Sequence, residues 1–148
     1  MPMMNESVHT IMVKDLITLE PEDSVLKVKD IFMKKRIHHI PVIENGMYVG
    51  LVTTYDLWKI DVKMSDYDDI KVKDIMSTKT LKISPDDKVG TAAELFLDNR
   101  FHALPVVQNG ILVGLVTSFD VLMYEFKKEY PEPILYREIL QSGLRAAM

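Results

Sequence analysis

The 148-residue sequence contains no cysteine, which excludes disulfide bonds, thiolate metal sites and cysteine nucleophiles. Its apolar runs are far shorter than the roughly 20 residues that a membrane-spanning helix needs. The formal net charge is −4 at pH 7 and lysines are interleaved with acids, so no basic face for nucleic acid is evident. The first ten residues also lack the basic start and apolar core of a signal peptide. We therefore expect a cytoplasmic protein that binds neither nucleic acid nor membranes.

Catalytic and metal-binding motifs are missing as well. The sequence has no serine nucleophile elbow, no HExxH and no GxxxxGK[S/T]. Apart from the adjacent pair His38 and His39, the four histidines show no spacing typical of metal ligands. The sequence thus predicts a protein that is not an enzyme, with no metal centre and no required cofactor.

What the sequence does contain is a duplication. Residues 8–57 align with residues 72–121 at a shift of 64 positions without a gap, and 19 of the 50 aligned residues are identical. This predicts two copies of one unit, packed with approximate two-fold symmetry. We place the first unit at 7–62, a polar linker at 63–70, the second unit at 71–129 and a tail at 130–148.

Each copy predicts the order strand, helix, strand, strand, helix, which makes the fold class mixed α/β (α+β). An Asn-Gly pair between two apolar runs is a strong hairpin signal, because both residues accept positive φ. Met33 and Leu97 are expected on the inward faces of the first helices. The predicted elements are short helical turns at 8–12 and 72–76, strands at 16–19 and 81–83, first helices capped by Asp23 and Asp87, hairpins at 40–52 and 104–116, and second helices at 54–62 and 118–129.

The most informative repeated stretch joins the last strand to the second helix in each copy. It reads Gly-Leu-Val-Thr-Thr-Tyr-Asp in the first copy and Gly-Leu-Val-Thr-Ser-Phe-Asp in the second. Thr53 and Thr117 stand at the N-cap, and Asp56 and Asp120 follow three residues later, where a carboxylate can bond back to the cap. The same hydroxyl and carboxylate could instead bind a ligand, and the pattern fits both interpretations.

The second helices are apolar on nearly every side, which predicts burial on more than one face. One face can serve the sheet of its own unit, and the other must meet the sister unit or a second chain. We therefore expect a homodimer. A terminal helix is expected over 134–147, in a tail long enough to reach a second chain.

Together these motifs resemble the CBS domain family. The matching patterns are Val-x-x-Ile-Met, Pro-x-Asp-x-Val, His-x-φ-Pro-Val (φ apolar), Asn-Gly and Gly-φ-φ-Thr-x-x-Asp, each present in both copies across residues 7–126. The resemblance implies a pair of CBS units, or Bateman module, each unit β-α-β-β-α, packed sheet to sheet with two clefts between them. In many members such clefts bind AMP, ADP, ATP or S-adenosylmethionine and act as regulatory sensors, and modules commonly dimerise through their helices.

Carried over to this sequence, the resemblance assigns Asp56 and Asp120 to the ribose of an adenine-containing ligand, each facing a separate ligand, and Thr53 and Thr117 to its phosphate. The two clefts are not expected to be equivalent, because the copies differ at several of these positions. The corner motifs hold no arginine, which leaves a preference for polyphosphates open. The other implied contacts are Thr18 and Lys82 near the base and sugar, His38 and His102 at the phosphate, and Ile40, Pro41, Val42, Leu104, Pro105 and Val106 around the adenine.

Two functions of different classes follow. In the first, an adenosine nucleotide binds between the units and the change is read by an unidentified regulated protein. In the second, the chain is a ligand-free dimerisation or scaffold module whose corners only cap helices. Nucleic-acid binding is the weakest alternative, because no basic face is evident.

Overall fold

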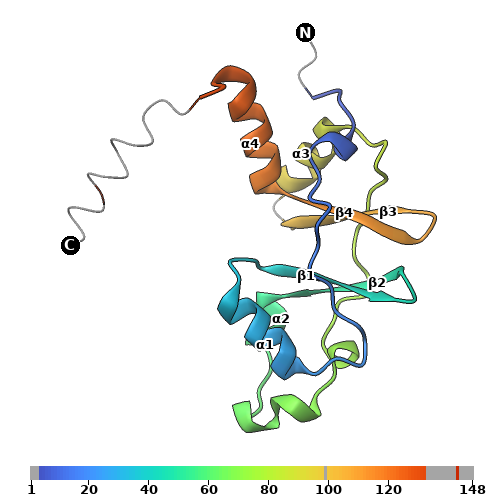
Figure 1. Ribbon diagram of the computed structural model, residues 1–148, viewed down its shortest axis with the longest axis vertical. Coiled ribbons are helices and arrows are strands. Elements are labelled where there is room, and N and C mark those ends of the chain that lie inside the picture. The colour runs from blue at the N-terminus through green and yellow to red at the C-terminus, as the bar shows by residue number, and fades with distance from the viewer. Residues whose placement is uncertain (1–3, 99, 133–142, 144–148) are drawn as a thin grey trace.

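In a computed structural model of the protein, the described residues are 4–98, 100–132 and 143. The chain forms two similar halves (Figure 1). The predicted terminal helix over 134–147 lies outside the described residues, apart from Gly143. The elements are 3-10 helix η1 (Val8–Thr10), α1 (Val25–Lys34), β1 (His39–Glu44), β2 (Met47–Thr53), α2 (Thr54–Trp58), η2 (Met64–Asp69), η3 (Val72–Asp74), α3 (Val89–Leu97), β3 (Ala103–Gln108), β4 (Ile111–Thr117) and α4 (Ser118–Glu129).

Both predicted hairpins form, β1 with β2 and β3 with β4, each in antiparallel register. The turns adopt the left-handed conformation that the Asn-Gly pairs were expected to supply. Asn45 and Gly46 have φ of 54° and 81°, and Asn109 and Gly110 have φ of 53° and 81°. Asparagine and glycine tolerate this region better than other residues, so the hairpin register is fixed locally in both copies.

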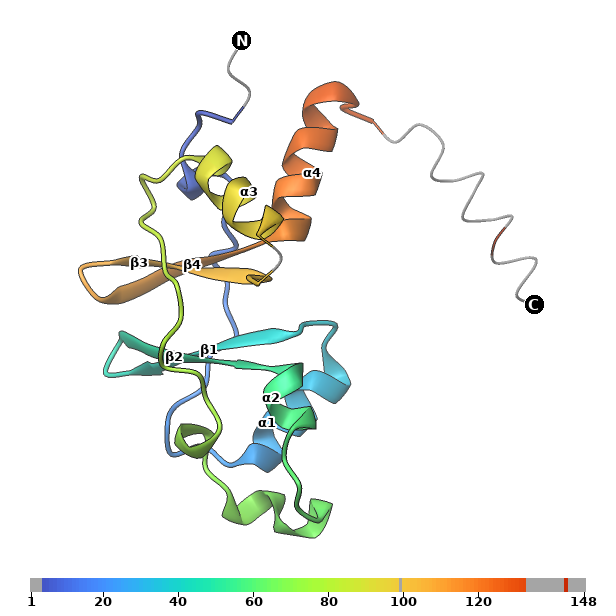
Figure 2. The same ribbon diagram turned by 180° about the vertical axis from the view of Figure 1, so that it is seen from behind.

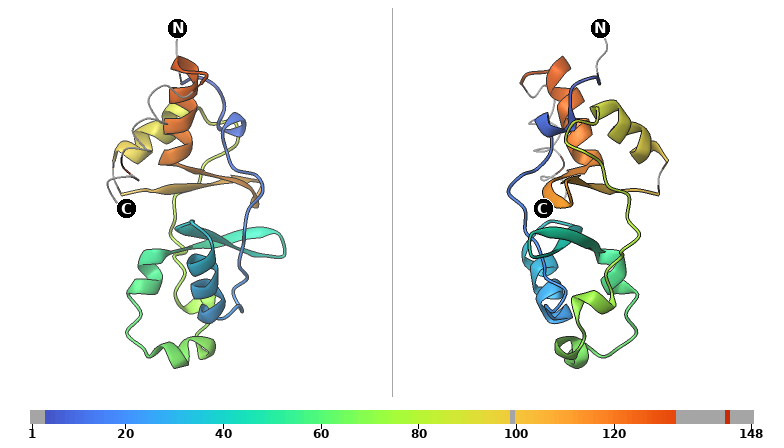
Figure 3. Two further views of the ribbon diagram at one scale, coloured as in Figure 1. Left: turned by 60° about the vertical axis from the view of Figure 1, so that its left-hand side comes forward. Right: turned by 90° about the vertical axis from the view of Figure 1, so that its right-hand side faces the viewer.

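The two hairpins join into one four-stranded sheet of order β1-β2-β4-β3, but only near their turns. A single pair, Met47 with Ile111, connects β2 to β4, and the Tyr48 N–H donates to the Gly110 carbonyl at 2.9 Å. The hairpins lie in the middle of the molecule, with α1 and α2 on one side and α3 and α4 on the other (Figure 3). In Figure 1 both hairpin turns lie on the right, and the strand-to-helix corners lie on the left. The corners thus lie away from the point where the hairpins are joined.

The first helical turn of each copy packs into the core of the other copy. Val8, from the first copy, is fully buried in a cluster with Val89, Leu104 and Val116 of the second. Val72, from the second copy, is fully buried with Leu19, Ile40 and Val52 of the first. Folding of either half therefore requires a segment of the other, so the repeat boundaries in sequence differ from the boundaries of the packed cores.

Two crossing segments, residues 13–18 and 77–82, connect these exchanged turns to their own copies. Val13 and Leu115 exchange backbone hydrogen bonds of 2.9 and 3.0 Å, and Ser77 and Leu51 exchange bonds of 3.0 and 2.9 Å. The segments pass on opposite sides of the hairpins, the blue one in front in Figure 1 and the yellow-green one in front in Figure 2. Where we expected strands over 16–19 and 81–83, the chain makes one isolated parallel bridge just after each crossing segment, Leu19 with Val42 and Ile83 with Val106. No longer strand forms, because the residues before each bridge are crossing between the halves.

Other local expectations were wrong at helix ends. Ser24, not Asp23, caps α1, its hydroxyl accepting from the Lys27 N–H at 3.3 Å. Lys88, not Asp87, occupies the N-cap of α3. The two aspartates instead close the preceding turns, accepting from the backbone N–H groups of Glu20 and Ser84, both at 2.7 Å.

Packing corrects the helix faces as well. Met33 and Leu97 are 76% and 84% exposed, although the helical pattern placed them inward. Helix α2 ends at Trp58 rather than at Val62, and the predicted linker contains the 3-10 helix η2, whose residues are mostly exposed.

Replacing Gly50 or Gly114 by alanine should destabilise the protein by about 1–3 kcal/mol each, because the chain lies directly on the strand there, at the point where an exchanged turn leads into a crossing segment. A Cβ at Gly50 would lie 3.0 Å from the Ser77 carbonyl oxygen, and one at Gly114 would lie 2.8 Å from Cγ of Met12. Urea unfolding of each variant measures the loss. A urea midpoint equal to that of the wild type would show that the chain packed on the strand can shift to accommodate the added methyl group without loss of stability.

Candidate functional site between the two units

A cavity of about 1300 Å³ lies between the two halves and includes the corners of both copies. Its lining combines apolar side chains from a crossing segment with polar and cationic side chains from both copies. Thus both corners open into one space, where we expected two clefts. The residues that line it are Val13, Asp15, Leu16, Ile17, Arg36, Ile37, His38, His39, Pro41, Thr53, Thr54, Tyr55, Arg100, His102, Leu115, Thr117, Ser118, Phe119 and Asp120.

The first corner is a complete capping box. The Asp56 carboxylate accepts from the Thr53 backbone N–H at 2.9 Å and from the Thr53 hydroxyl at 3.1 Å, and the Asp56 N–H donates to that hydroxyl at 3.1 Å. Asp56 is only 5% exposed, and its other oxygen lies 3.6 Å from the Lys59 ammonium. Thr53 lines the cavity and Asp56 does not. The Asp56 carboxylate therefore makes its hydrogen bonds and its ion pair within the protein and is not presented to a ligand in the cavity.

The second corner repeats the two hydrogen bonds from the threonine to the aspartate but presents its acid to the cavity. One Asp120 carboxylate oxygen accepts from the Thr117 N–H at 2.8 Å and from the Thr117 hydroxyl at 3.0 Å. Asp120 is partly exposed and lines the cavity, and no cation of the described residues forms an ion pair with it. Its second oxygen therefore remains available to accept hydrogen bonds from a ligand hydroxyl.

Two arginines at equivalent positions of the repeat, Arg36 and Arg100, also line the cavity. Arg100 donates two hydrogen bonds of 2.9 Å to the carboxylate of Asp98, which partly neutralises its charge. Arg36 forms no ion pair within the described part of the chain. The first-copy side of the cavity therefore carries the more available guanidinium for an anionic ligand.

Three histidines line the same space. His38 and His102 are equivalent in the repeat and exposed, whereas His39 is half-buried and has an alanine at its equivalent position. Burial lowers the pKa of His39 from 6.5 to about 4, and the nearby His102 and His38 act in the same direction while Asp56 opposes them. His39 is therefore a neutral imidazole at pH 7, which can contact a ligand without adding charge.

The depressed pKa of His39 predicts a loss of stability in mild acid. Between pH 6.5 and pH 4 the unfolded chain binds the proton and the folded chain does not, so the free energy of unfolding falls as the pH is lowered through this window. The contribution is complete above pH 6.5. Urea midpoints at pH 7.5, 5.5 and 4.5 measure it, and His39→Ala, which copies Ala103 of the second unit, should flatten the dependence. Parallel curves for the two proteins would rule out His39 as the source.

The structure brings together only part of the predicted site. His38, His102, Pro41, Thr53, Thr117 and Asp120 line the cavity. Ile40, Val42, Leu104 and Val106 are fully buried in the two cores and do not line the cavity, and Pro105, although buried, does not line it either. Thr18 and Lys82 lie outside the lining, and the Lys82 ammonium is instead 6.0 Å from the centre of the Tyr48 ring.

Sequence reasoning missed several lining residues. Arg36 and Arg100 are identical in the two copies, and that identity was the signal available for them. Tyr55 and Phe119, 60% and 62% exposed, occupy equivalent aromatic positions in the corner motif. The contribution of the crossing segment was not predictable, because it depends on how the halves exchange their first turns.

Two further properties concern the described residues alone. They include no group of three or more histidine, aspartate or glutamate side chains arranged to hold a metal ion. None of their helices combines the length and the apolar character needed to traverse a membrane.

The duplicated sequence, the two α/β halves and the inter-unit cavity define a pair of CBS units. The family model for the CBS domain matches residues 8–57 and 72–127, and the chain belongs to that family. The predicted family and the mixed α/β fold class are thereby confirmed.

A curated relative of this chain is an enzyme several times its length. The inosine-5′-monophosphate dehydrogenase of Korarchaeum cryptofilum is 32% identical over 118 residues, covering 79% of this chain and 24% of the dehydrogenase. The chain spans about a quarter of the length of the first curated relatives it matches.

Among solved structures, CBSX2 in complex with AMP has a TM-score of 0.75 and 27% identity, covering 84% of this chain and 98% of that one; CBSX2 is from Arabidopsis thaliana. The CBS domain pair of MJ0100, in complex with 5′-methylthioadenosine and S-adenosyl-L-methionine, has a TM-score of 0.69 and 26% identity, covering 82% and 97%.

Proposed function

We propose that this chain is a regulatory module that binds an adenosine nucleotide (AMP, ADP or ATP) or S-adenosylmethionine in the inter-unit cavity, and that it acts by binding and not by catalysis. The observation that carries this is the cavity itself, which unites an available carboxylate, apolar walls and cationic side chains in a space large enough for a nucleotide. CBS pairs of similar fold, 26% and 27% identical, bind adenosine compounds, which supports the proposal.

Within the cavity, Asp120 accepts the ribose hydroxyls, because it is the corner carboxylate that faces the space. Val13, Leu16 and Leu115 offer apolar surface to the base. The phosphate is directed toward Arg36 and His38 on the first-copy side, where charge is least neutralised.

Isothermal titration of the full chain with AMP, ADP, ATP and S-adenosylmethionine tests the proposal, with GMP as a control for recognition of the base. We expect saturable one-site binding of at least one adenine ligand and an increase in melting temperature with its concentration. If none of the four produces heat or a thermal shift at millimolar concentration, the proposal fails.

The signal to a regulated protein is also a proposal. The crossing segment that lines the cavity follows closely after η1, whose Val8 is buried in the core of the second unit. A ligand that contacts Val13 to Ile17 therefore acts on a segment attached to both halves. We propose that binding changes the angle between the units and that a partner protein recognises that change.

We further propose that the chain is a homodimer. Exposed apolar residues recur at equivalent positions of the two copies, Met33 with Leu97 and Trp58 with Leu122, all on helices. Their side chains are 67–84% exposed, and apolar side chains that gather into a patch on a protein surface commonly mark an interface with a partner. The same observation favours the second candidate, a ligand-free dimerisation module, in which the corner aspartates serve only as caps.

A further inference from the structure

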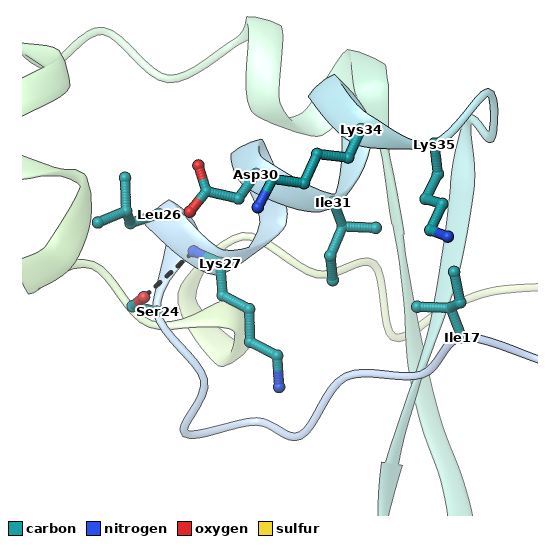
Figure 4. A pocket seen from close by; sticks show the side chains of 8 residues that line it. All are labelled: Ile17, Ser24, Leu26, Lys27, Asp30, Ile31, Lys34 and Lys35. Carbon is teal, nitrogen blue, oxygen red and sulfur yellow. Dashed lines mark hydrogen bonds between the residues drawn. The ribbon is translucent and has the colours of Figure 1, made fainter.

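A smaller cavity of about 330 Å³ adjoins the inter-unit cavity on the side of α1 (Figure 4). The two cavities share one lining residue, Ile17 of the crossing segment. The smaller cavity is lined by three lysines, Lys27, Lys34 and Lys35, and by one carboxylate, Asp30. It is therefore a cationic extension of the proposed nucleotide site.

Three consecutive cations, Lys34, Lys35 and Arg36, which we call the basic ridge, join the two spaces. The first two line the smaller cavity and the third lines the inter-unit cavity. In Figure 4 the side chains of Lys35 and Ile17 extend toward each other, whereas the side chain of Lys34 extends along α1 toward Asp30. None of the three cations forms an ion pair within the described part of the chain, so their charge is available to a ligand.

The second copy has the opposite character at the equivalent positions. Asp98 replaces Lys34, Asn99 replaces Lys35, and Arg100 is held by Asp98 through two hydrogen bonds of 2.9 Å. The basic ridge is therefore a feature of one end of the cavity, in a chain whose net charge is −4. A need for helix stability alone does not explain the difference, because both copies build the same first helix.

We infer that the ligand carries a chain of two or three phosphates, and that this chain leaves the inter-unit cavity past Ile17 and lies along the basic ridge. The inference rests on the proposed function and specifies its ligand. A single phosphate is satisfied by Arg36 and His38 inside the cavity and leaves the lysines unused. A longer chain reaches them. Lys27 is paired with Asp23 at 3.1 Å, but Lys34, Lys35 and Arg36 still outnumber the lining carboxylates Asp15 and Asp30, which favours a polyanionic ligand.

The test compares AMP with ATP in three proteins by isothermal titration at low salt. One is the wild type, one is the double variant Lys34→Gln/Lys35→Gln, and the control is Lys29→Gln/Lys63→Gln, which removes the same charge from residues that line neither cavity. We expect ATP to bind the wild type more tightly than AMP. The ridge variant should lose about three- to tenfold in ATP affinity, as is typical of two exposed charges, with AMP affinity unchanged. The control should match the wild type for both ligands.

The outcomes separate this inference from the proposed function. If AMP and ATP bind equally well and the ridge variant changes neither, the inference is overturned while nucleotide binding stands. If no adenine ligand binds, both fall. Inorganic tripolyphosphate distinguishes the source of the phosphate chain, since without a nucleoside it should bind much more weakly than ATP. Equal affinity would assign the ridge to free phosphate chains and overturn its role in nucleotide binding.

Discussion

Asp120→Ala is expected to weaken binding of an adenosine ligand by about 10- to 100-fold, the loss that follows from removing charged hydrogen bonds worth about 1.5–3 kcal/mol. Asp120 lines the inter-unit cavity, and only one of its two carboxylate oxygens is bonded to Thr117. The other oxygen can accept hydrogen bonds from a ligand. The same variant also loses a helix cap, which should lower the free energy of unfolding by about 0.5–2 kcal/mol. Titration gives the first quantity and urea unfolding the second.

The repeat supplies the matched control. Asp56→Ala removes the same capping interactions from the equivalent position, but Asp56 is 5% exposed, is paired with Lys59 and does not line the cavity. We expect it to lower stability at least as much as Asp120→Ala while changing ligand affinity by less than about twofold. Equal losses of affinity would mean that both corners bind ligand. Stability losses with no effect on affinity in either variant would favour the scaffold interpretation.

Leu122→Glu is expected to convert a dimer into a monomer of 17.0 kDa. Leu122 lies on α4 and is 67% exposed, and Phe126, one turn later on the same helix, is 43% exposed; we call this pair the apolar helix surface. A carboxylate there would have to be desolvated in the dimer, at a cost of several kcal/mol, but remains in water in the monomer. Light scattering after size exclusion at micromolar concentration measures the change.

Ile111→Glu serves as the control for that experiment. Ile111 is also exposed, at 49%, but lies at the start of β4 beside the hairpin turn, away from α2 and α4 (Figure 1). It should leave the oligomeric state unchanged. A wild type that already elutes as a monomer would refute the dimer and leave the apolar helix surface to another partner.

The elements that were predictable from the sequence are those set by local chemistry. The Asn-Gly turns impose positive φ whatever surrounds them, and Thr53 and Thr117 bond within three residues of themselves, so hairpins and corners followed from short stretches. Helix ends were less predictable because two polar residues compete at each one. Ser24 and Asp23 could each cap α1. In the structure Ser24 caps the helix, and Asp23 accepts a hydrogen bond from the Glu20 N–H in the turn that precedes it.

The site divides in the same way. His38, His102, Thr53, Thr117 and Asp120, which the family resemblance assigned to a ligand, line the cavity. The predicted adenine wall at Ile40, Val42, Leu104 and Val106 stays a prediction; the side chains of these residues are buried in the two cores, and alternation along a strand does not reveal which face meets the partner half and which meets the helices. Both faces of these strands are apolar, and only packing distinguishes them.

By itself the sequence determined that the chain consists of two copies of one CBS unit, with hairpins and capped corners in each, because these follow from identical residues at a fixed spacing and from interactions within a few residues. Only the tertiary structure decided that the first turns exchange between halves, that both corners share one cavity, and that Asp120 faces it while Asp56 is buried. Those outcomes depend on contacts between residues far apart in the sequence, such as Val8 with Leu104 and Val116, 96 and 108 positions away, and Val72 with Leu19, 53 positions away. Nothing in a local pattern specifies which half a segment packs against.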